Sequence, residues 1–158
     1  MIAGMNQKLP TLATLLGIAG LLPFLACGVA ALGPQGDRAA LALAAYGAVI
    51  LAFLVGVHWG FALLGPAGRG ERERLALGVV PSLIGWVALL LAVAVRVEAG
   101  LLLLLLGFLG TTIVEARARR AGLMPHGYMA LRYGLSAGVV LVLALVLVLR
   151  AIGAQIAI

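Results

Sequence analysis

Charged residues are scarce in this chain. Asp and Glu together number five and Lys and Arg eleven in 158 residues, so that 10% of the sequence is charged while 65% is hydrophobic. A soluble domain has roughly 25% charged and 45–50% apolar residues. No soluble fold of this length could bury so much apolar surface. The composition therefore predicts a protein embedded in a lipid bilayer.

Cysteine and histidine are also sparse: the chain has one cysteine, Cys27, and two histidines, His58 and His126. A single cysteine excludes an intrachain disulfide bond and a cysteine metal cluster. The sequence also lacks a phosphate-binding glycine loop, a zinc-protease motif, a nucleophile elbow and a haem-attachment motif. These absences argue against an enzyme, and we expect no catalytic residue, metal or cofactor.

Long apolar runs, by contrast, fill the sequence. They cover about residues 11–32, 39–64, 75–95, 99–114 and 134–152. A helix needs roughly 20 apolar residues to cross the hydrocarbon core of a bilayer. The breaks between the runs are too short for a separate soluble domain. We predict an all-α membrane protein, a bundle of five transmembrane helices that forms a single integral domain over residues 1–158.

Two features of the runs predict local geometry. Pro23 lies inside the first run, where it should kink the helix because proline cannot donate a backbone hydrogen bond. The third and fourth runs are separated only by residues 96–100. A break this short predicts that the two helices form an antiparallel hairpin.

The basic residues are distributed unevenly between the two sides of such a bundle. With five spans, one side carries eight of them and the other carries Arg38, Arg96 and Arg150. By the rule that short cytoplasmic loops are enriched in Lys and Arg, we expect the N-terminus in the cytoplasm and the C-terminus outside. Anionic lipid headgroups, rather than nucleic acid, are the expected partners of this charge. The eight are Lys8, Arg69, Arg72, Arg74, Arg117, Arg119, Arg120 and Arg132.

Polar and aromatic residues gather near the predicted cytoplasmic end, whereas the other end reads as nearly plain hydrocarbon. Ionisable residues within a span are costly and ask for a partner or a wet cavity. His58 is either a structural hydrogen-bonding residue, part of a ligand pocket, or a proton-handling group. The aromatics also fit an interfacial belt, and Glu115 fits an ion pair with a nearby arginine. A hypothetical pocket for a quinone, a lipid or a haem would be lined by His58, Trp59, Ser82, Trp86, Glu115 and Arg132.

Two pairs of glycines are candidates for helix packing. Gly56 and Gly60 lie four residues apart in the second run, and Gly134 and Gly138 repeat this spacing in the last run. Small residues at this spacing let another helix approach closely in a membrane. We expect these faces to contact a neighbouring helix, whether of this chain, of a second copy or of a partner.

Several of these motifs resemble a known family. The box Gly56-Val57-His58-Trp59-Gly60 is the most specific, and it is accompanied by the runs 20–24, 46–51 and 81–86 and by Pro125, Tyr128 and Arg132. Together they resemble a family of small bacterial inner-membrane proteins of unknown function, similar to the mitochondrial inner-membrane transmembrane protein 69. The resemblance implies a multi-pass protein of the bacterial inner membrane with this number of spans. It implies no activity and no catalytic residues.

The functional prediction follows from absent catalytic motifs together with these packing faces. We expect a non-catalytic accessory or assembly subunit that packs against another membrane protein or complex. The alternative is a small-molecule binder or redox helper with a cytoplasmic-side pocket at His58. A transporter is less well supported, because no internal repeat is visible and the outer half of the spans is plain.

Overall fold

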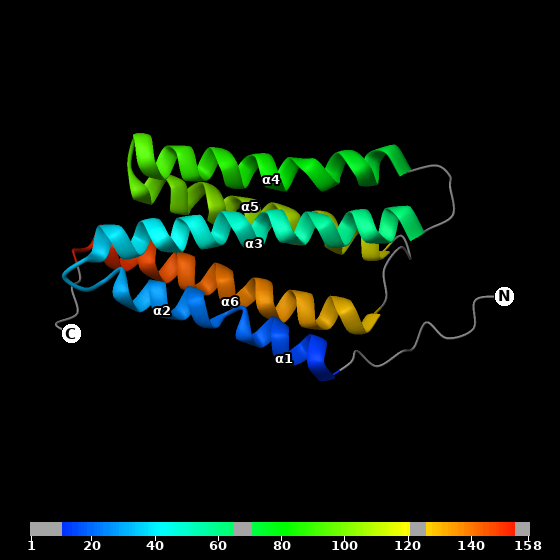
Figure 1. Cartoon of the computed structure of the whole chain (residues 1–158), viewed down its shortest axis with the longest axis horizontal. Helices are drawn as coiled ribbons and strands as arrows, with labels where there is room; N and C mark the ends of the chain where they lie inside the picture. The colour runs from blue at the N-terminus through cyan, green and yellow to red at the C-terminus, as the bar shows by residue number, and fades with distance from the viewer. Residues whose placement is uncertain (1–10, 65–70, 121–125, 154–158) are drawn as a thin grey trace.

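The computed structural model of the chain describes residues 11–64, 71–120 and 126–153, and these residues form an antiparallel helix bundle. Its helices are α1 (Thr11–Ala19), α2 (Leu22–Ala30), α3 (Gly36–Leu64), α4 (Glu71–Ala94), α5 (Val97–Arg120) and α6 (His126–Ala151). The helices run roughly parallel to one long axis, and the start of α1 and the end of α6 lie at opposite ends of it (Figure 1). No strand occurs among the described residues. The predicted all-α class is therefore confirmed.

Within the described ranges, four segments are long and apolar enough to cross a membrane: Thr11–Ala30, Gly36–Leu54, Val97–Arg117 and Ala130–Ala151. The segment Val79–Ala94 of α4 is apolar but shorter. Large apolar side chains cover the outside of the bundle, among them Phe53, Val93 and Leu141, each about two-thirds exposed. A soluble monomer rarely exposes a continuous apolar surface of this kind, whereas lipid chains accept it.

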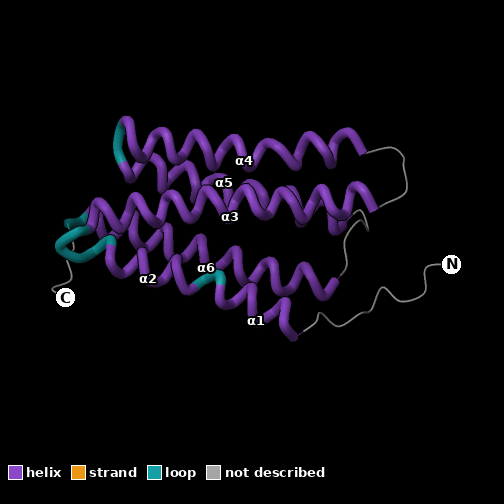
Figure 2. Tube along the Cα trace, viewed as in Figure 1, coloured by secondary structure: helices purple, strands orange, loops and turns teal. Residues whose placement is uncertain are grey.

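The first apolar run is interrupted, as Pro23 predicts. The helix stops at Ala19 and resumes at Leu22 (Figure 2), with Pro23 in the first turn of α2, where its missing N–H costs nothing. The hydroxyl of Tyr46 on α3 donates a hydrogen bond of 3.0 Å to the carbonyl of Gly20. This bond satisfies a carbonyl that the helix break leaves at the edge of the regular ladder, and it fixes the break to the neighbouring helix.

The core lies where α2, α3 and α5 meet. The ring of Phe24 packs edge-on against Tyr46 and Phe108, with ring centroids 5.0 and 6.1 Å apart. Phe24 and Phe108 are each 1% exposed. Edge-to-face aromatic pairs add about 0.5–1.5 kcal/mol beyond the area they bury. These rings join the interrupted first span to the rest of the bundle.

Two glycines outside the predicted pairs make the closest helix contacts. A Cβ at Gly85 of α4 would lie 3.0 Å from the carbonyl oxygen of Ala48 on α3. A Cβ at Gly100 of α5 would lie 2.5 Å from the carbonyl oxygen of Ala88 on α4. Because the backbones approach so closely there, α3, α4 and α5 form a tight three-helix unit.

The helix α5 extends beyond the fourth predicted run. The fourth run was expected to end near residue 114, but α5 continues to Arg120. The predicted end followed the first charged residue, Glu115. That residue is buried within the bundle, so the charge does not mark the end of the helix.

Candidate functional site

An ion pair is buried between α5 and α6. Arg132 donates from Nε and Nη2 to the same oxygen of Glu115, Oε1, at 3.2 and 3.0 Å. The side chains are 5% and 1% exposed, and both residues lie in segments that qualify as membrane spans. Charges placed in this environment are expensive unless they are paired. The structure thus brings together two of the six residues predicted for a pocket.

A serine hydroxyl lies one helix turn deeper than the pair. Ser136 follows Arg132 by four residues on α6 and is 3% exposed. Within the described part of the chain its Oγ has no hydrogen-bond partner. A buried hydroxyl without a hydrogen-bond partner costs about 1–3 kcal/mol, so this corner of the bundle favours a molecule that can hydrogen-bond to Ser136.

Position 58 of α3 lies at about the same height along the bundle as the Glu115–Arg132 pair, although the side chains of His58 and Trp59 lie outside what the structure describes. On α3 it follows the buried residues Leu51 and Leu54 by seven and four, which places it on their helix face. Leu51 meets Gly107 of α5, and α3 and α5 run in the same direction (Figure 1). From that contact, about 10 Å of helix leads to position 58 and about 12 Å to Glu115.

The other predicted pocket residues lie elsewhere. Trp86 is 60% exposed on the outer surface of α4, and Ser82 is half-buried one turn away on the same helix. Neither residue makes a hydrogen bond to Glu115 or Arg132. The contact between Gly85 and Ala48 places Trp86 near the middle of the apolar band, away from the charged level.

The glycines of the two predicted packing pairs also differ in their surroundings. A Cβ at Gly138 would lie 3.2 Å from Leu21, so this glycine packs within the chain. At Gly56 and Gly134 an added Cβ would meet nothing within 4 Å, and both positions are exposed. Gly60 belongs to α3, but its surroundings lie outside the described residues. Two of the predicted packing positions therefore face away from the bundle.

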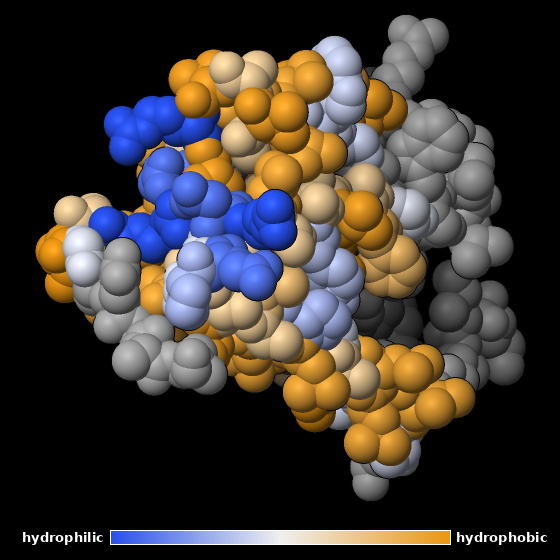
Figure 3. Space-filling model, turned by 60° about the vertical axis from the view of Figure 1, so that its left-hand side comes forward, coloured by the Kyte–Doolittle hydropathy of each residue, from blue (hydrophilic) through white to orange (hydrophobic). Residues whose placement is uncertain are grey.

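The opposite end of the bundle is not plain hydrocarbon, which corrects the sequence-based expectation. Arg150, at the last turn of α6, donates from Nε and Nη2 to Glu98 of α5 at 3.1 and 2.8 Å. It also donates to Asp37 of α3 at 2.5 Å and to the carbonyl of Ala31 at 3.0 Å. Hydrophilic residues form a patch on this end of the molecule (Figure 3). Each of these charges was visible at the edge of a predicted run, but their convergence depended on the register of α5 and α6.

The two charged levels bracket the apolar band. Glu98 and Glu115 are 17 residues apart on α5, and Arg132 and Arg150 are 18 apart on α6. At 1.5 Å per residue these separations are both about 26 Å. The two Arg–Glu contacts thus fix the antiparallel register of α5 and α6. Their spacing is close to the roughly 30 Å thickness of a hydrocarbon core.

Among the residues that the structure describes, no three His, Cys, Asp or Glu side chains come together as a set that could hold a metal ion. The arrangement instead offers a buried hydrogen-bonding corner at one level and an accessible charged network at the other.

These features define a multi-pass helical membrane protein with a charged cluster near each end of its spans. Comparison with known families is consistent with this class. The chain belongs to the family described as "Protein of unknown function (DUF3429)", whose model matches residues 9–148. The resemblance predicted from the sequence is thereby confirmed.

Sequence similarity to a curated protein agrees with this family assignment. The chain is 39% identical over 102 residues to Transmembrane protein 69 from Xenopus tropicalis, an alignment that covers 62% of this chain and 40% of that relative. The chain thus corresponds to less than half of the relative's length. No solved structure matches the chain.

Proposed function

We propose that this protein is a non-catalytic subunit of the bacterial inner membrane that packs against another membrane protein through the outer face of α6. In this proposal α4 also crosses the membrane and brings the number of spans to five, the N-terminus is cytoplasmic and the C-terminus is periplasmic. The antiparallel course of the helices, with α1 starting and α6 ending at opposite ends, supports five passes. The excess of basic residues on the N-terminal side supports the orientation.

The observation that carries the proposal is a change in side-chain size along the exposed stripe of α6. At the level of the buried pair the stripe consists of Ala130, Gly134 and Ala137, all exposed. Toward the other end it continues with Leu141, Leu145 and Val148, which are 67%, 52% and 58% exposed. Small residues confined to one half of a lipid-facing stripe provide a shallow surface for a second helix.

The physical reason lies in the nature of association within lipid. Lipid chains are as apolar as leucine, so helices associate there by close packing and interhelical hydrogen bonds rather than by the hydrophobic effect. A glycine on the outer surface allows backbones to approach, and no described residue packs against Gly134 in that way. On the inner side of the same turns, Arg132 is bonded to Glu115, which holds this part of α6 in place.

The test uses two glycines one turn apart on α6. In Gly134→Ile the new Cβ has no described atom within 4 Å, so we expect folding to be retained while the partner is lost from a mild-detergent purification. Gly138→Ile presses against Leu21 and lowers thermal stability instead. The measurements are quantitative mass spectrometry of co-purifying membrane proteins and the melting temperature of the purified chain. An unchanged set of co-purifying proteins in Gly134→Ile, or none in the wild type, would overturn the proposal.

A second function is favoured by the site around Arg132 and Ser136, where the buried Ser136 hydroxyl has no hydrogen-bond partner among the described residues. We propose as the alternative that a small molecule with an acceptor oxygen, such as a quinone, binds beside them, on the side of α6 that faces α5. Ser136→Ala removes one of its donors, while Ser82→Ala provides a matched control on α4. Solvent extraction of the purified protein should then yield less ligand from Ser136→Ala alone. Absence of any extractable ligand from the wild type would exclude this alternative.

A further inference from the structure

A pocket of about 500 Å³ opens at the end of the bundle that carries Arg150. Its walls come from the turn between α2 and α3, the first turns of α3 and α5, and the last turn of α6. Its polar side chains are those of Gln35, Asp37, Arg38, Glu98 and Arg150. The volume lies within the range of small-molecule sites, roughly 300–1,000 Å³.

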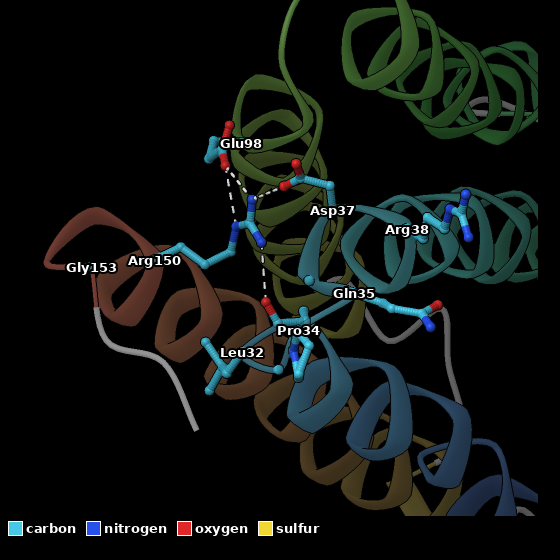
Figure 4. A pocket seen from close by; sticks show the side chains of 11 residues that line it. Leu32, Pro34, Gln35, Asp37, Arg38, Glu98, Arg150 and Gly153 are labelled. Atoms are coloured by element: carbon cyan, nitrogen blue, oxygen red, sulfur yellow. Dashed lines mark hydrogen bonds and ion pairs between the residues drawn. The ribbon is translucent and has the colours of Figure 1, made fainter. Parts of the chain in front are cut away.

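The charged wall of this pocket is held in place by Arg150. Its guanidinium contacts the carboxylates of Glu98 and Asp37 and the carbonyl of Ala31, so three other segments are tied to α6 (Figure 4). Its side chain is 16% exposed, and most of its N–H donors are engaged in these bonds. Arg150 therefore serves as the frame of the pocket rather than as a free binding group.

Two lining groups remain open, and they have opposite charge. Asp37 is 87% exposed, and only one of its oxygens is engaged by Arg150. Arg38 is exposed and forms no ion pair with any described residue. In Figure 4, Asp37 is directed toward Arg150, whereas Arg38 and Gln35 extend to another side. The pocket thus presents an acceptor for a cation at one position and donors for an anion at another.

The lining as a whole is electrically balanced. Two guanidinium groups, Arg38 and Arg150, face two carboxylates, Asp37 and Glu98. A ligand with a single charge would leave one of the open groups without a counter-charge. A zwitterion with separated charges matches both.

The depth of the pocket indicates where such a zwitterion comes from. The pocket lies about 26 Å along the helices from the buried Glu115–Arg132 pair, with the apolar band between the two levels. This places it at the edge of the hydrocarbon core, in the layer of lipid headgroups. Exposed apolar side chains of α2, such as Val29, lie just below it and would accompany a lipid chain.

We propose that this pocket binds a phosphodiester joined to a primary ammonium, the headgroup chemistry of phosphatidylethanolamine. The phosphate accepts hydrogen bonds from the Arg38 guanidinium and the Gln35 amide, and the ammonium donates to the carboxylate of Asp37. A choline headgroup has the same charges but no N–H donor, and a glycerol headgroup has no cation. The site is therefore selective for the ammonium form. This inference concerns the opposite end of the molecule from the proposed protein interface and does not depend on it.

The test is native mass spectrometry of the purified full-length chain with equal amounts of phosphatidylethanolamine and phosphatidylcholine of matched chains. The wild type should bind the ethanolamine lipid about tenfold more tightly, the effect of one charge-assisted hydrogen bond. Asp37→Asn should reduce this preference strongly, because an amide oxygen accepts more weakly from the ammonium than a carboxylate does, and it should weaken choline-lipid binding less. Arg38→Gln should weaken binding of both lipids. As a control, Arg117→Gln changes an exposed arginine near the other end of α5, outside the pocket, and should change neither.

Two further results test whether the site exists and whether its ligand is a soluble headgroup compound or a membrane lipid. Binding of soluble glycerophosphoethanolamine by the wild type, weakened in Asp37→Asn, supports the pocket and assigns it to the headgroup alone. Binding of the lipid without binding of the soluble compound supports the pocket and assigns it to the membrane. Equal affinity of the wild type for both lipids, or an unchanged preference in a folded Asp37→Asn variant, would overturn the proposal. Melting temperatures establish that each variant is folded.

Discussion

The two ends of the α5–α6 pair use the same residue types in different surroundings. At one end Arg132 and Glu115 are 5% and 1% exposed and bind each other. At the other, Arg150 is 16% exposed, and its partners Glu98 and Asp37 are 31% and 87% exposed. Burial makes a broken pair costly because a charge is left without water, whereas exposed groups recover hydration. The comparison shows that similar ion pairs can have very different effects on stability.

The largest expected effect comes from breaking the buried pair on one side only. Arg132→Met leaves Glu115 buried without its cation and should lower the free energy of unfolding by about 3–5 kcal/mol. Replacing both residues, as in Glu115→Leu with Arg132→Met, should recover most of that loss because no charge remains buried. Unfolding in mixed micelles measures Arg132→Met, the single variant Glu115→Leu and the double variant. Losses that simply add in the double variant would show that the pair is not coupled.

A smaller loss is expected at the accessible end. Arg150→Met removes the hydrogen bonds to Glu98, Asp37 and the Ala31 carbonyl, but the two carboxylates regain water. The expected loss of unfolding free energy is about 1–2 kcal/mol. The chemical accessibility of a cysteine introduced into the α2–α3 turn should also rise, because Arg150 no longer holds this turn. A loss as large as that of Arg132→Met would contradict the difference between the two ends.

The dependence of stability on salt concentration provides a further test of the difference between the two ends. Exposed charges are screened with a Debye length of about 10 Å at 0.1 M and about 3 Å at 1 M ionic strength, while buried pairs are screened much less. The stability difference between the wild type and Arg150→Met should shrink as salt rises, and that for Arg132→Met should not. Melting temperatures at low and high salt provide the measurement. Equal salt dependence at both ends would mean that water reaches the Glu115–Arg132 pair.

The smallest effect is expected at Asp37. Its side chain is 87% exposed, and Arg150 retains Glu98 and the Ala31 carbonyl after the change. Asp37→Asn should alter the free energy of unfolding by no more than about 0.5 kcal/mol. The same variant is expected to show a much weaker lipid preference. A strongly destabilised Asp37→Asn would indicate that Asp37 supports the fold rather than a ligand.

Much of the fold could be predicted from hydropathy alone, because the bilayer imposes the length and polarity of each span. The runs coincide with the observed helices to within a few residues at most ends, and Pro23 correctly predicted the interruption near Gly20. The predicted span ends next to Glu115, a residue that was expected to pair with a nearby arginine. Only the position of Arg132 on the adjacent helix shows that this carboxylate has a buried partner.

The candidate site was only partly predictable, since side-chain convergence depends on helix rotation and register. Hydropathy could not show that Trp86 faces outward. It also could not show that Gly134 and Gly138 have different surroundings, although the two glycines belong to one GxxxG pair. The close contacts at Gly85 and Gly100 fall outside the GxxxG spacing that was used to predict packing. The network at Arg150 was missed because its members come from the ends of four different runs.

The central claim, that the small-residue half of α6 binds another membrane protein, is tested most directly by photo-crosslinking in intact cells. A photoreactive side chain at Ala137 lies on the small half of the exposed stripe, and the same group at Leu145 lies on the large half. The account predicts a discrete protein adduct from position 137 and only lipid adducts from position 145. Equal labelling at the two positions, or lipid adducts alone at position 137, would contradict it.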